Sequence, residues 1–285
     1  MKRLCFSIDV ERDYRTDGRL TTRGIDEGLP AFVDFLESKE IPFDIFVSGE
    51  VADALPQNLI QKLGNLVALG CHGLHHPPGL AGYLNRRSLE TQKAEIKTAT
   101  ELTIQRLGRR PLSFRAPNFA VNEETLTALR DLGYQADSSI LPGRLVRKLK
   151  VWTLLDQRGA PLAPYYPDSN AIVRPGSFPL LEVPVTPSLR EPGSPVGLGL
   201  LNDLGPEVAV KEASQSVARY IVFLCHSWEM VDWSTTAPVV PWVRRASSAS
   251  MVQFTRFVEA LNDTAFLNIQ EIFLREKRAV SSSVC

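Results

Sequence analysis

The sequence predicts an α/β protein in which parallel strands alternate with helices, and two observations support this prediction. Short apolar runs alternate with amphipathic segments along most of the 285 residues, a pattern that is typical of βα units. Several apolar runs also end in a charged or polar residue. This is typical of a parallel barrel, in which functional side chains lie at the carboxyl ends of the strands. A chain of this length can bury one large core.

Hydrophobic periodicity places the individual elements. Strands are expected where short apolar runs end in polar residues, at 4–11, 42–48, 112–119, 134–140, 220–226 and 265–269. Helices are expected where apolar residues recur every three or four positions, at 29–39, 50–69 with a break near Pro56, 88–107, 123–132, 206–220 and 250–261. Ser88 and Asn122 are suitable N-caps, and Gly108 suits a helix C-terminus.

Residues 1–275 are expected to form one barrel domain. Within it, residues 141–205 are rich in Pro and Gly but also carry apolar bursts, so we expect one or two strands within an irregular insertion that lines the cleft. Residues 276–285 are charged and then Ser-rich, and we expect them to form a flexible tail.

Composition narrows the function classes. Lys+Arg and Asp+Glu each total 32, whereas a nucleic-acid-binding protein would favour a basic patch. No apolar run reaches the length of about 18 residues that a membrane span needs, and the N-terminal apolar stretch is too short for a signal peptide and is interrupted by Asp9. We therefore expect a cytoplasmic protein. The scattered cysteines form no CxxC pair and indicate reduced thiols, three of them buried: Cys5, Cys71, Cys225 and Cys285.

Three of the four histidines lie within eight residues, between Gly70 and Pro77. His72 and His76 are four positions apart, and on a helical turn this spacing places both imidazoles on one face, close enough to bind one ion. The alternative is a helix N-terminus with incidental histidines. His75 stays unassigned, as a loop residue, a substrate contact or an alternative ligand.

The ends of the predicted strands carry the other candidate groups. Because side chains alternate along a strand, Asp9 and Glu11 point to one face and Val10 to the other. Two His and one carboxylate form a three-ligand catalytic metal site that leaves a position open for water, and a second carboxylate can take a proton from that water. Three more polar strand ends would meet them at the same rim: Arg115, Asp137 and His226.

These groups suit the hydrolysis of an amide or an ester. A His can protonate the leaving group, an Asp can hold that His in its donor tautomer, and an Arg beside the base keeps the base ionised.

Five segments make the chain resemble the polysaccharide deacetylases of the NodB-homology type, carbohydrate esterase family 4. The family's usual motifs are Thr-Phe-Asp-Asp-Gly, His-Ser/Thr-x-x-His-Pro, Arg-x-Pro, an Asp-Ser-Ser segment and Leu-x-His. In this chain they correspond, in the same order, to Ser7-Ile8-Asp9-Val10-Glu11, His72-Gly73-Leu74-His75-His76-Pro77, Arg115-Ala116-Pro117, Asp137-Ser138-Ser139 and Leu224-Cys225-His226.

The resemblance implies a distorted (β/α)7 barrel with one divalent metal ion, zinc first, with Co²⁺, Ni²⁺, Mn²⁺ or Fe²⁺ as alternatives. The usual carboxylate ligand falls on Val10, which cannot bind a metal. Some branches of the family write Asp-Val-Glu and bind the metal through the third residue, which here is Glu11. Glu11, His72 and His76 are therefore the expected ligands.

The resemblance also implies the remaining roles. Asp9 would be the base and His226 the acid, with Asp137 orienting His226 and Arg115 paired with Asp9. A backbone N–H near Asn118 would stabilise the oxyanion. The tryptophans after His226 are candidates for the substrate pocket, Trp228 first, with packing at the barrel rim as the alternative.

The function expected from these features is removal of an N-acetyl or N-formyl group from an amino sugar. The substrate would be a cytoplasmic glycan precursor: a sugar nucleotide, a lipid-linked sugar or a small oligosaccharide. Two alternatives stay open. One is a metal-free ureide hydrolase resembling allantoinase, and the other is a catalytically silent barrel that binds glycans. The sequence leaves the oligomeric state open.

Overall fold

The computed structural model describes residues 1–285 except 78, 235–238, 241–245 and 283–285. Its strands are β1 (Lys2–Val10), β2 (Phe43–Val47), β3 (Val67–Cys71), β4 (Ser113–Phe114), β5 (Ala136–Asp137), β6 (Leu145–Lys148), β7 (Trp152–Asp156), β8 (Pro167–Asp168), β9 (Ala171–Pro175), β10 (Leu181–Glu182), β11 (Ile221–His226) and β12 (Thr264–Phe266). Its longer helices are α1 (Leu29–Ser38), α2 (Gln57–Lys62), α3 (Leu89–Leu107), α4 (Glu123–Asp131), α5 (Leu198–Leu204), α6 (Pro206–Gln215), α7 (Ser250–Glu259) and α8 (Ile269–Ser282).

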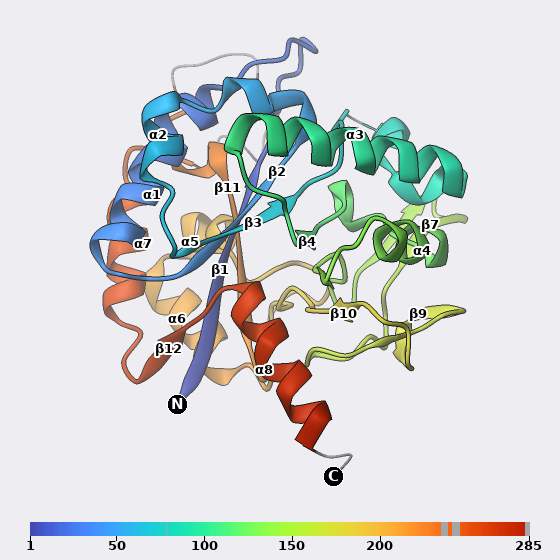
Figure 1. Cartoon of the computed structure of the whole chain (residues 1–285). Coiled ribbons are helices and arrows are strands. Elements are labelled where there is room, and N and C mark those ends of the chain that lie inside the picture. Colours follow the sequence, from blue (N-terminus) through green and yellow to red (C-terminus); the bar gives the residue numbers. More distant parts are fainter. Residues whose placement is uncertain (78, 235–238, 241–245, 283–285) are drawn as a thin grey trace.

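Seven parallel strands form a curled sheet in the order β10-β5-β4-β3-β2-β1-β11, and β12 pairs with the start of β1. The gap between the two ends of the sheet is bridged by backbone hydrogen bonds from Thr186 to Val222 and from Leu224 to Val196, of 3.2 and 3.1 Å. In the view of Figure 1, helices α1 and α7 lie to the left of the central strands, and α3 and α4 lie toward the right. The predicted single-domain, distorted (β/α)7 barrel is confirmed.

The apolar face of the first strand explains how the helices dock. Phe6 is fully buried in β1, and its ring lies 5.6 Å from Phe223 of β11, 5.2 Å from Phe254 of α7 and 5.8 Å from Phe266 of β12. Such aromatic contacts bury a large apolar area with defined geometry. They fix β1, which carries the candidate base, at the centre of the molecule.

Most expected elements lie within a few residues of their predicted bounds, and the predicted caps hold. The Ser88 side chain accepts a hydrogen bond from the Thr91 N–H, Asn122 accepts one from Thr125, and Gly108 follows α3 in the left-handed conformation with φ 66°. Cys5, Cys71 and Cys225 are buried free thiols, as predicted, and Cys285 lies outside the described residues. None of the described helices is both long enough and apolar enough to span a membrane.

Two expected elements are wrong. The helix predicted to run to residue 69 ends at Lys62, and 67–71 form β3, because the run Val67–Leu69 pairs in parallel with β2. The tail predicted from residue 276 is helical through Ser282. Glu276 accepts a hydrogen bond of 2.7 Å from the Tyr220 hydroxyl and one of 3.0 Å from Arg219, so tertiary contacts order a segment whose composition suggested flexibility.

Residues 141–205 contain more regular structure than the sequence indicated. They form two antiparallel pairs, β6 with β7 and β8 with β9, together with β10 and α5. Part of this insertion nevertheless lines the cleft, as predicted, through Arg144, Pro195 and Gly199.

Candidate functional site

The carboxyl ends of the parallel strands bring the candidate residues to one rim. Asp9 and His226 lie on neighbouring strands and are directly paired in the register of β1 with β11. Glu11 comes just after β1, His72 directly follows β3, and Arg115 directly follows β4. The rim is therefore assembled by strand pairing, as expected for a parallel barrel.

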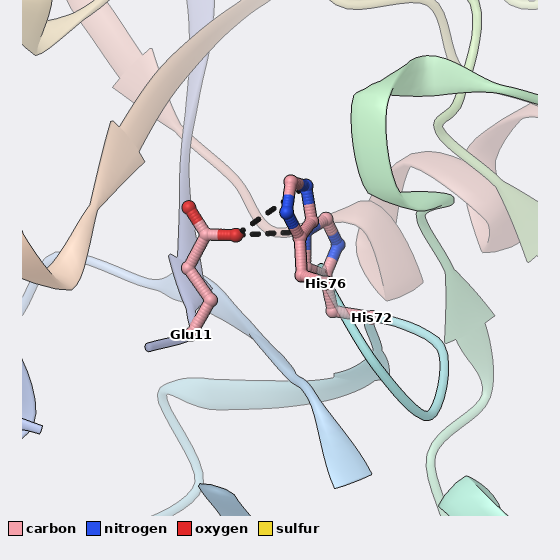
Figure 2. A group of neighbouring side chains, drawn as sticks. All are labelled: Glu11, His72 and His76. Atoms are coloured by element: carbon pink, nitrogen blue, oxygen red, sulfur yellow. Dashed lines mark ion pairs between the residues drawn. The ribbon is translucent and has the colours of Figure 1, made fainter. Parts of the chain in front are cut away.

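Glu11, His72 and His76 form a buried cluster whose ligand atoms all lie within 4.8 Å of one another. Glu11 Oε2 lies 3.6 Å from the Nε2 atoms of both His72 and His76, and the two imidazoles are stacked side by side (Figure 2). In a tetrahedral site with ligand distances of about 2.0–2.2 Å, ligand atoms lie about 3.3–3.6 Å apart. The donor set and its spacing therefore fit a divalent metal ion.

The outer atoms of two of these ligands are held by other residues. His72 Nδ1 donates a hydrogen bond of 2.9 Å to the Arg115 carbonyl, which leaves Nε2 with a free lone pair. The Trp228 indole N–H donates one of 3.0 Å to Glu11 Oε1, which leaves Oε2 facing the imidazoles. Such outer contacts fix the tautomer and orientation of metal ligands. They are independent support for a metal site.

The two histidines occupy a loop and not the helical turn on which their spacing was first interpreted. After β3 the chain turns at Gly73, whose φ is 70°, and the loop brings the imidazoles to a centroid distance of 5.6 Å. His75 points elsewhere. Its side chain is about half exposed, and its Nδ1 lies 3.5 Å from Glu50, so the structure does not place it among the ligands.

The candidate base is fixed by a buried arginine. Arg115 Nη1 donates a hydrogen bond of 2.8 Å to Asp9 Oδ1, and both side chains are almost fully buried. Arg115 is itself held by the Ser138 carbonyl and hydroxyl oxygens, at 3.0 and 2.9 Å. Asp9 Oδ2 is directed toward His72 Nε2 at 3.8 Å and His226 Nε2 at 4.0 Å. One carboxylate oxygen is thus anchored and the other faces the site.

The partner of His226 is Glu229, and the prediction that Asp137 orients this histidine is wrong. Glu229 Oε2 accepts hydrogen bonds from the His226 ring at Nδ1 (3.1 Å) and from its backbone N–H (2.8 Å). Burial lowers the pKa of His226, but the Glu229 carboxylate, with smaller contributions from Glu11 and Asp9, raises it to about 9. This pKa favours the protonated form of His226 near neutral pH, and its Nε2 is directed at the candidate base, Asp9.

Asp137 is instead buried beside Ser139, which bonds to the backbone next to Arg115. Its carboxylate accepts a hydrogen bond of 2.5 Å from the Ser139 hydroxyl, and it is paired in register with Glu182 of β10. Burial raises the pKa of both carboxyl groups. Through Ser139, Asp137 therefore supports the backbone beside Arg115, and His226 has Glu229 as its partner.

Tyr14 is a second residue that sequence reasoning missed. Its hydroxyl lies 3.2 Å from Glu11 Oε2 and 2.5 Å from His76 Nδ1. Its ring packs edge-on against Trp228 at a centroid distance of 5.8 Å. The sequence signal that could have identified Tyr14 is its position three residues after Glu11. It was missed because the surrounding loop has no regular pattern.

These groups open into a cleft of about 350 Å³. Both residues predicted to contact substrate line it. Asn118 has φ 57° and donates from Nδ2 to the Gly82 carbonyl at 3.1 Å. Trp228 stacks on His226 at 4.7 Å and donates to Glu11, so it contacts two of the candidate site residues. Trp233 is buried and donates to the Trp228 carbonyl at 2.8 Å, which is packing at the rim.

Fold and site together define a (β/α) barrel hydrolase with a candidate metal centre at the carboxyl ends of its strands. Residues 17–136 match the family model described as "Polysaccharide deacetylase". This match includes His72, His76 and Arg115. The resemblance to the NodB-homology polysaccharide deacetylases that was stated from the motifs is thus confirmed over residues 17–136. No curated protein sequence matches the chain.

Solved structures share the fold over nearly the whole chain. A candidate polysaccharide deacetylase from Mycobacterium smegmatis is 17% identical, covers 98% of this chain and 91% of its own, and has a TM-score of 0.61. The peptidoglycan deacetylase PdaC from Bacillus subtilis is 14% identical, with coverages of 99% and 95% and a TM-score of 0.53. BA3943 from Bacillus anthracis, a family 4 pseudoenzyme, is 11% identical, with coverages of 95% and 65% and a TM-score of 0.50. Since a pseudoenzyme shares the fold, activity has to be argued from the site.

Proposed function

We propose that this protein is a metal-dependent hydrolase that removes an N-acetyl or N-formyl group from an amino sugar. The observation that carries the proposal is the joint placement of three groups in one cleft. The Glu11–His72–His76 cluster, an anchored Asp9 and a protonated His226 all face the same space. An amide hydrolase needs these three parts: a polarising ion, a base and an acid.

Glu11, His72 and His76 would hold the divalent ion, zinc in the first instance, and an ion bound there supplies Lewis-acid chemistry, activating water and polarising the acyl oxygen. The chain contributes the geometry. The Arg115 carbonyl and the Trp228 indole hold the outer atoms of two ligands, so the ligands are oriented before any ion binds.

Asp9 accepts the proton of the attacking water at Oδ2. Arg115 occupies Oδ1, so the free oxygen is the one that faces the site. The water oxygen forms a bond to the acyl carbon. The backbone near Asn118 at the cleft wall is the proposed source of an N–H for the developing oxyanion.

His226 completes the reaction by donating the proton on Nε2 to the sugar nitrogen as the C–N bond breaks. Glu229 accepts the Nδ1 proton, which fixes the ring with Nε2 directed at the cleft. The products are the free amine and acetic or formic acid. After the products leave, Asp9 releases its proton to solvent and His226 takes one up, so both groups return to their starting states.

The acyl group and the sugar remain predictions from the sequence, as does the expectation of a cytoplasmic glycan precursor. The experiment compares wild type with Asp9→Asn and His76→Ala, using release of acetic or formic acid from acylated amino sugars and the zinc content of the purified proteins. His75→Ala is the matched control, because it removes an imidazole from the same loop that is exposed and paired with Glu50.

Asp9→Asn is expected to lose turnover but keep the metal, and His76→Ala to lose both. His75→Ala is expected to keep the metal. Full activity in Asp9→Asn would overturn the assignment of the base. Wild-type protein that hydrolyses a substrate without any bound ion would overturn the metal mechanism and favour the ureide-hydrolase class, and inactivity on every acylated sugar with the metal bound would favour the silent barrel.

A further inference from the structure

Arg144 lines the same cleft as the candidate catalytic residues. It lies just before β6, at the start of the 141–205 insertion and outside the five family motifs. No motif singled it out, and the mechanism above does not use it. Its surroundings, however, are unusual for a charged side chain.

The backbone at Arg144 is held tightly. Its N–H donates to the Leu141 carbonyl at 3.0 Å, and its carbonyl accepts from the Gln157 N–H at 2.8 Å. A side chain at Gly193 would meet the Cα atom of Arg144 at 2.8 Å, so only glycine allows the two segments to approach this closely. The position of Arg144 is therefore specified by the fold on two sides.

The guanidinium is partly stripped of water, and no carboxylate of the described residues pairs with it. Its carbon lies 5.3 Å from the centre of the Phe119 ring, and Nη1 donates a hydrogen bond of 3.2 Å to the Gly193 carbonyl. Nε is buried with no hydrogen-bond partner among the residues described. Within that part of the chain, no carboxylate oxygen lies within 4.0 Å of the guanidinium, and burial lowers its pKa.

Two other cations beside the candidate catalytic groups are paired. Arg115 has Asp9 at 2.8 Å, and His226 has Glu229 at 3.1 Å. Keeping a charge away from water without a partner costs free energy. The planar donor fork of a partly buried arginine suits a carboxylate or a phosphate, which can offset this cost. Arg144 differs from these two cations because no carboxylate of the described residues pairs with it.

We propose that the substrate of this site carries an oxyanion, a carboxylate or a phosphate, that pairs with Arg144 when the acylated amino sugar lies in the cleft. This inference rests on the proposed function, because it assigns the substrate class of the same site. A neutral acylated sugar would leave the guanidinium unpaired, whereas an anionic one would replace the lost hydration with two charge-assisted hydrogen bonds. The site would therefore bind the anionic sugar in preference to the neutral one.

The experiment measures acid release from three probes: N-acetylglucosamine, its phosphate ester and N-acetylmuramic acid, which carries a carboxylate. The variant is Arg144→Met, which keeps an unbranched apolar stem against Phe119. The matched control is Arg147→Met, which removes an exposed positive charge from β6, three residues away. Arg144→Lys retains the charge without the fork, and thermal melts of all variants report folding.

In wild type the kcat/KM for one anionic probe is expected to exceed that for the neutral probe. Arg144→Met is expected to lower this ratio at least tenfold, Arg147→Met to leave it unchanged, and Arg144→Lys to lie between. The anionic probe whose kcat/KM falls most in Arg144→Met shows whether the bound anion is a phosphate or a carboxylate. A ratio that is the same in wild type and Arg144→Met, or a wild-type preference for the neutral sugar, would overturn the inference.

Binding separates this inference from the proposed function. Calorimetry on Asp9→Asn, with and without Arg144→Met, measures the affinity for each probe without turnover. If anionic sugars bind in an Arg144-dependent way but wild type releases no acid from any probe, the proposed hydrolysis fails and the anion site stands. If acid is released and neither binding nor turnover depends on Arg144, the hydrolysis stands and the anion site fails.

Discussion

Replacing Glu229 by Gln tests how the proton donor is kept charged. Glu229 Oε2 binds both the Nδ1 atom and the backbone N–H of His226. Gln has the same shape and can still accept through its carbonyl oxygen, so the hydrogen bonds can persist while the negative charge is lost. The substitution therefore isolates the electrostatic part of the contact.

The expected change in the pKa of His226 follows from its distance to Glu229 and from the other carboxylates around it. An opposite charge within about 4–6 Å changes a pKa by roughly 1–3 units, and one unit corresponds to about 1.4 kcal/mol. The Glu229 oxygen lies 3.1 Å from Nδ1. Asp9 and Glu11 still lie 4.0 and 3.9 Å from Nε2 in the variant, so only part of the favourable field is lost. We expect the pKa of His226 to fall by about 1–3 units.

The assay is the pH dependence of kcat/KM for acyl release. Its alkaline limb reports loss of the protonated acid in the free enzyme, so the limb should move to lower pH by the same 1–3 units. A bound metal ion repels the imidazolium in both proteins, and the comparison is therefore the difference between wild type and Glu229→Gln.

Asp137→Asn is the matched control, because it removes the carboxylate that sequence reasoning had assigned to this role. It should leave the position of the alkaline limb unchanged. An alkaline limb that moved in Asp137→Asn and stayed fixed in Glu229→Gln would refute the assignment of Glu229 as the partner of His226.

Two further predictions concern stability and are checked by urea denaturation. Burial raises the pKa of Asp44 to about 7, above its unfolded value of about 4, so this group contributes stability that is present below pH 4 and lost as the pH rises through 7. Asp44→Asn should therefore flatten the fall in free energy of unfolding across this range, and an unchanged fall would contradict the pKa. A methyl group at Gly70 would overlap the Phe46 ring, whose face lies 4.3 Å from the Arg115 guanidinium. Gly70→Ala should cost about 1–3 kcal/mol by overpacking, and undiminished stability would contradict this reading of the packing.

The first strand shows how much local pattern can predict. Alternation along a strand placed Asp9 and Glu11 on one face, and the structure directs both toward the cleft. The pairing of Asp9 with His226 could not be obtained in this way. It depends on the register between two strands that are more than 200 residues apart, and register is set by the packing of whole strands.

The histidine loop and the acid partner show where local pattern fails. His72 and His76 were grouped by helical spacing, yet a turn at Gly73 after β3 brings them together. Asp137 was assigned to His226 by the order of the motifs. The true contact is made by Glu229 because a single helical turn, Ser227–Met230, folds this side chain back onto the histidine. Side-chain direction in short irregular segments carries no periodic signal.

The register of β1 with β11 bears on how a catalytic barrel can diversify. Asp9 and His226, the proposed proton acceptor and proton donor, are neighbours in a hydrogen-bonded ladder, so a mutation that altered their spacing would also disturb the sheet. Arg144 comes from an insertion whose hairpins lie outside that ladder. If Arg144 binds the substrate as proposed, changes in residues 141–205 can alter substrate preference without disturbing the pairing of Asp9 with His226.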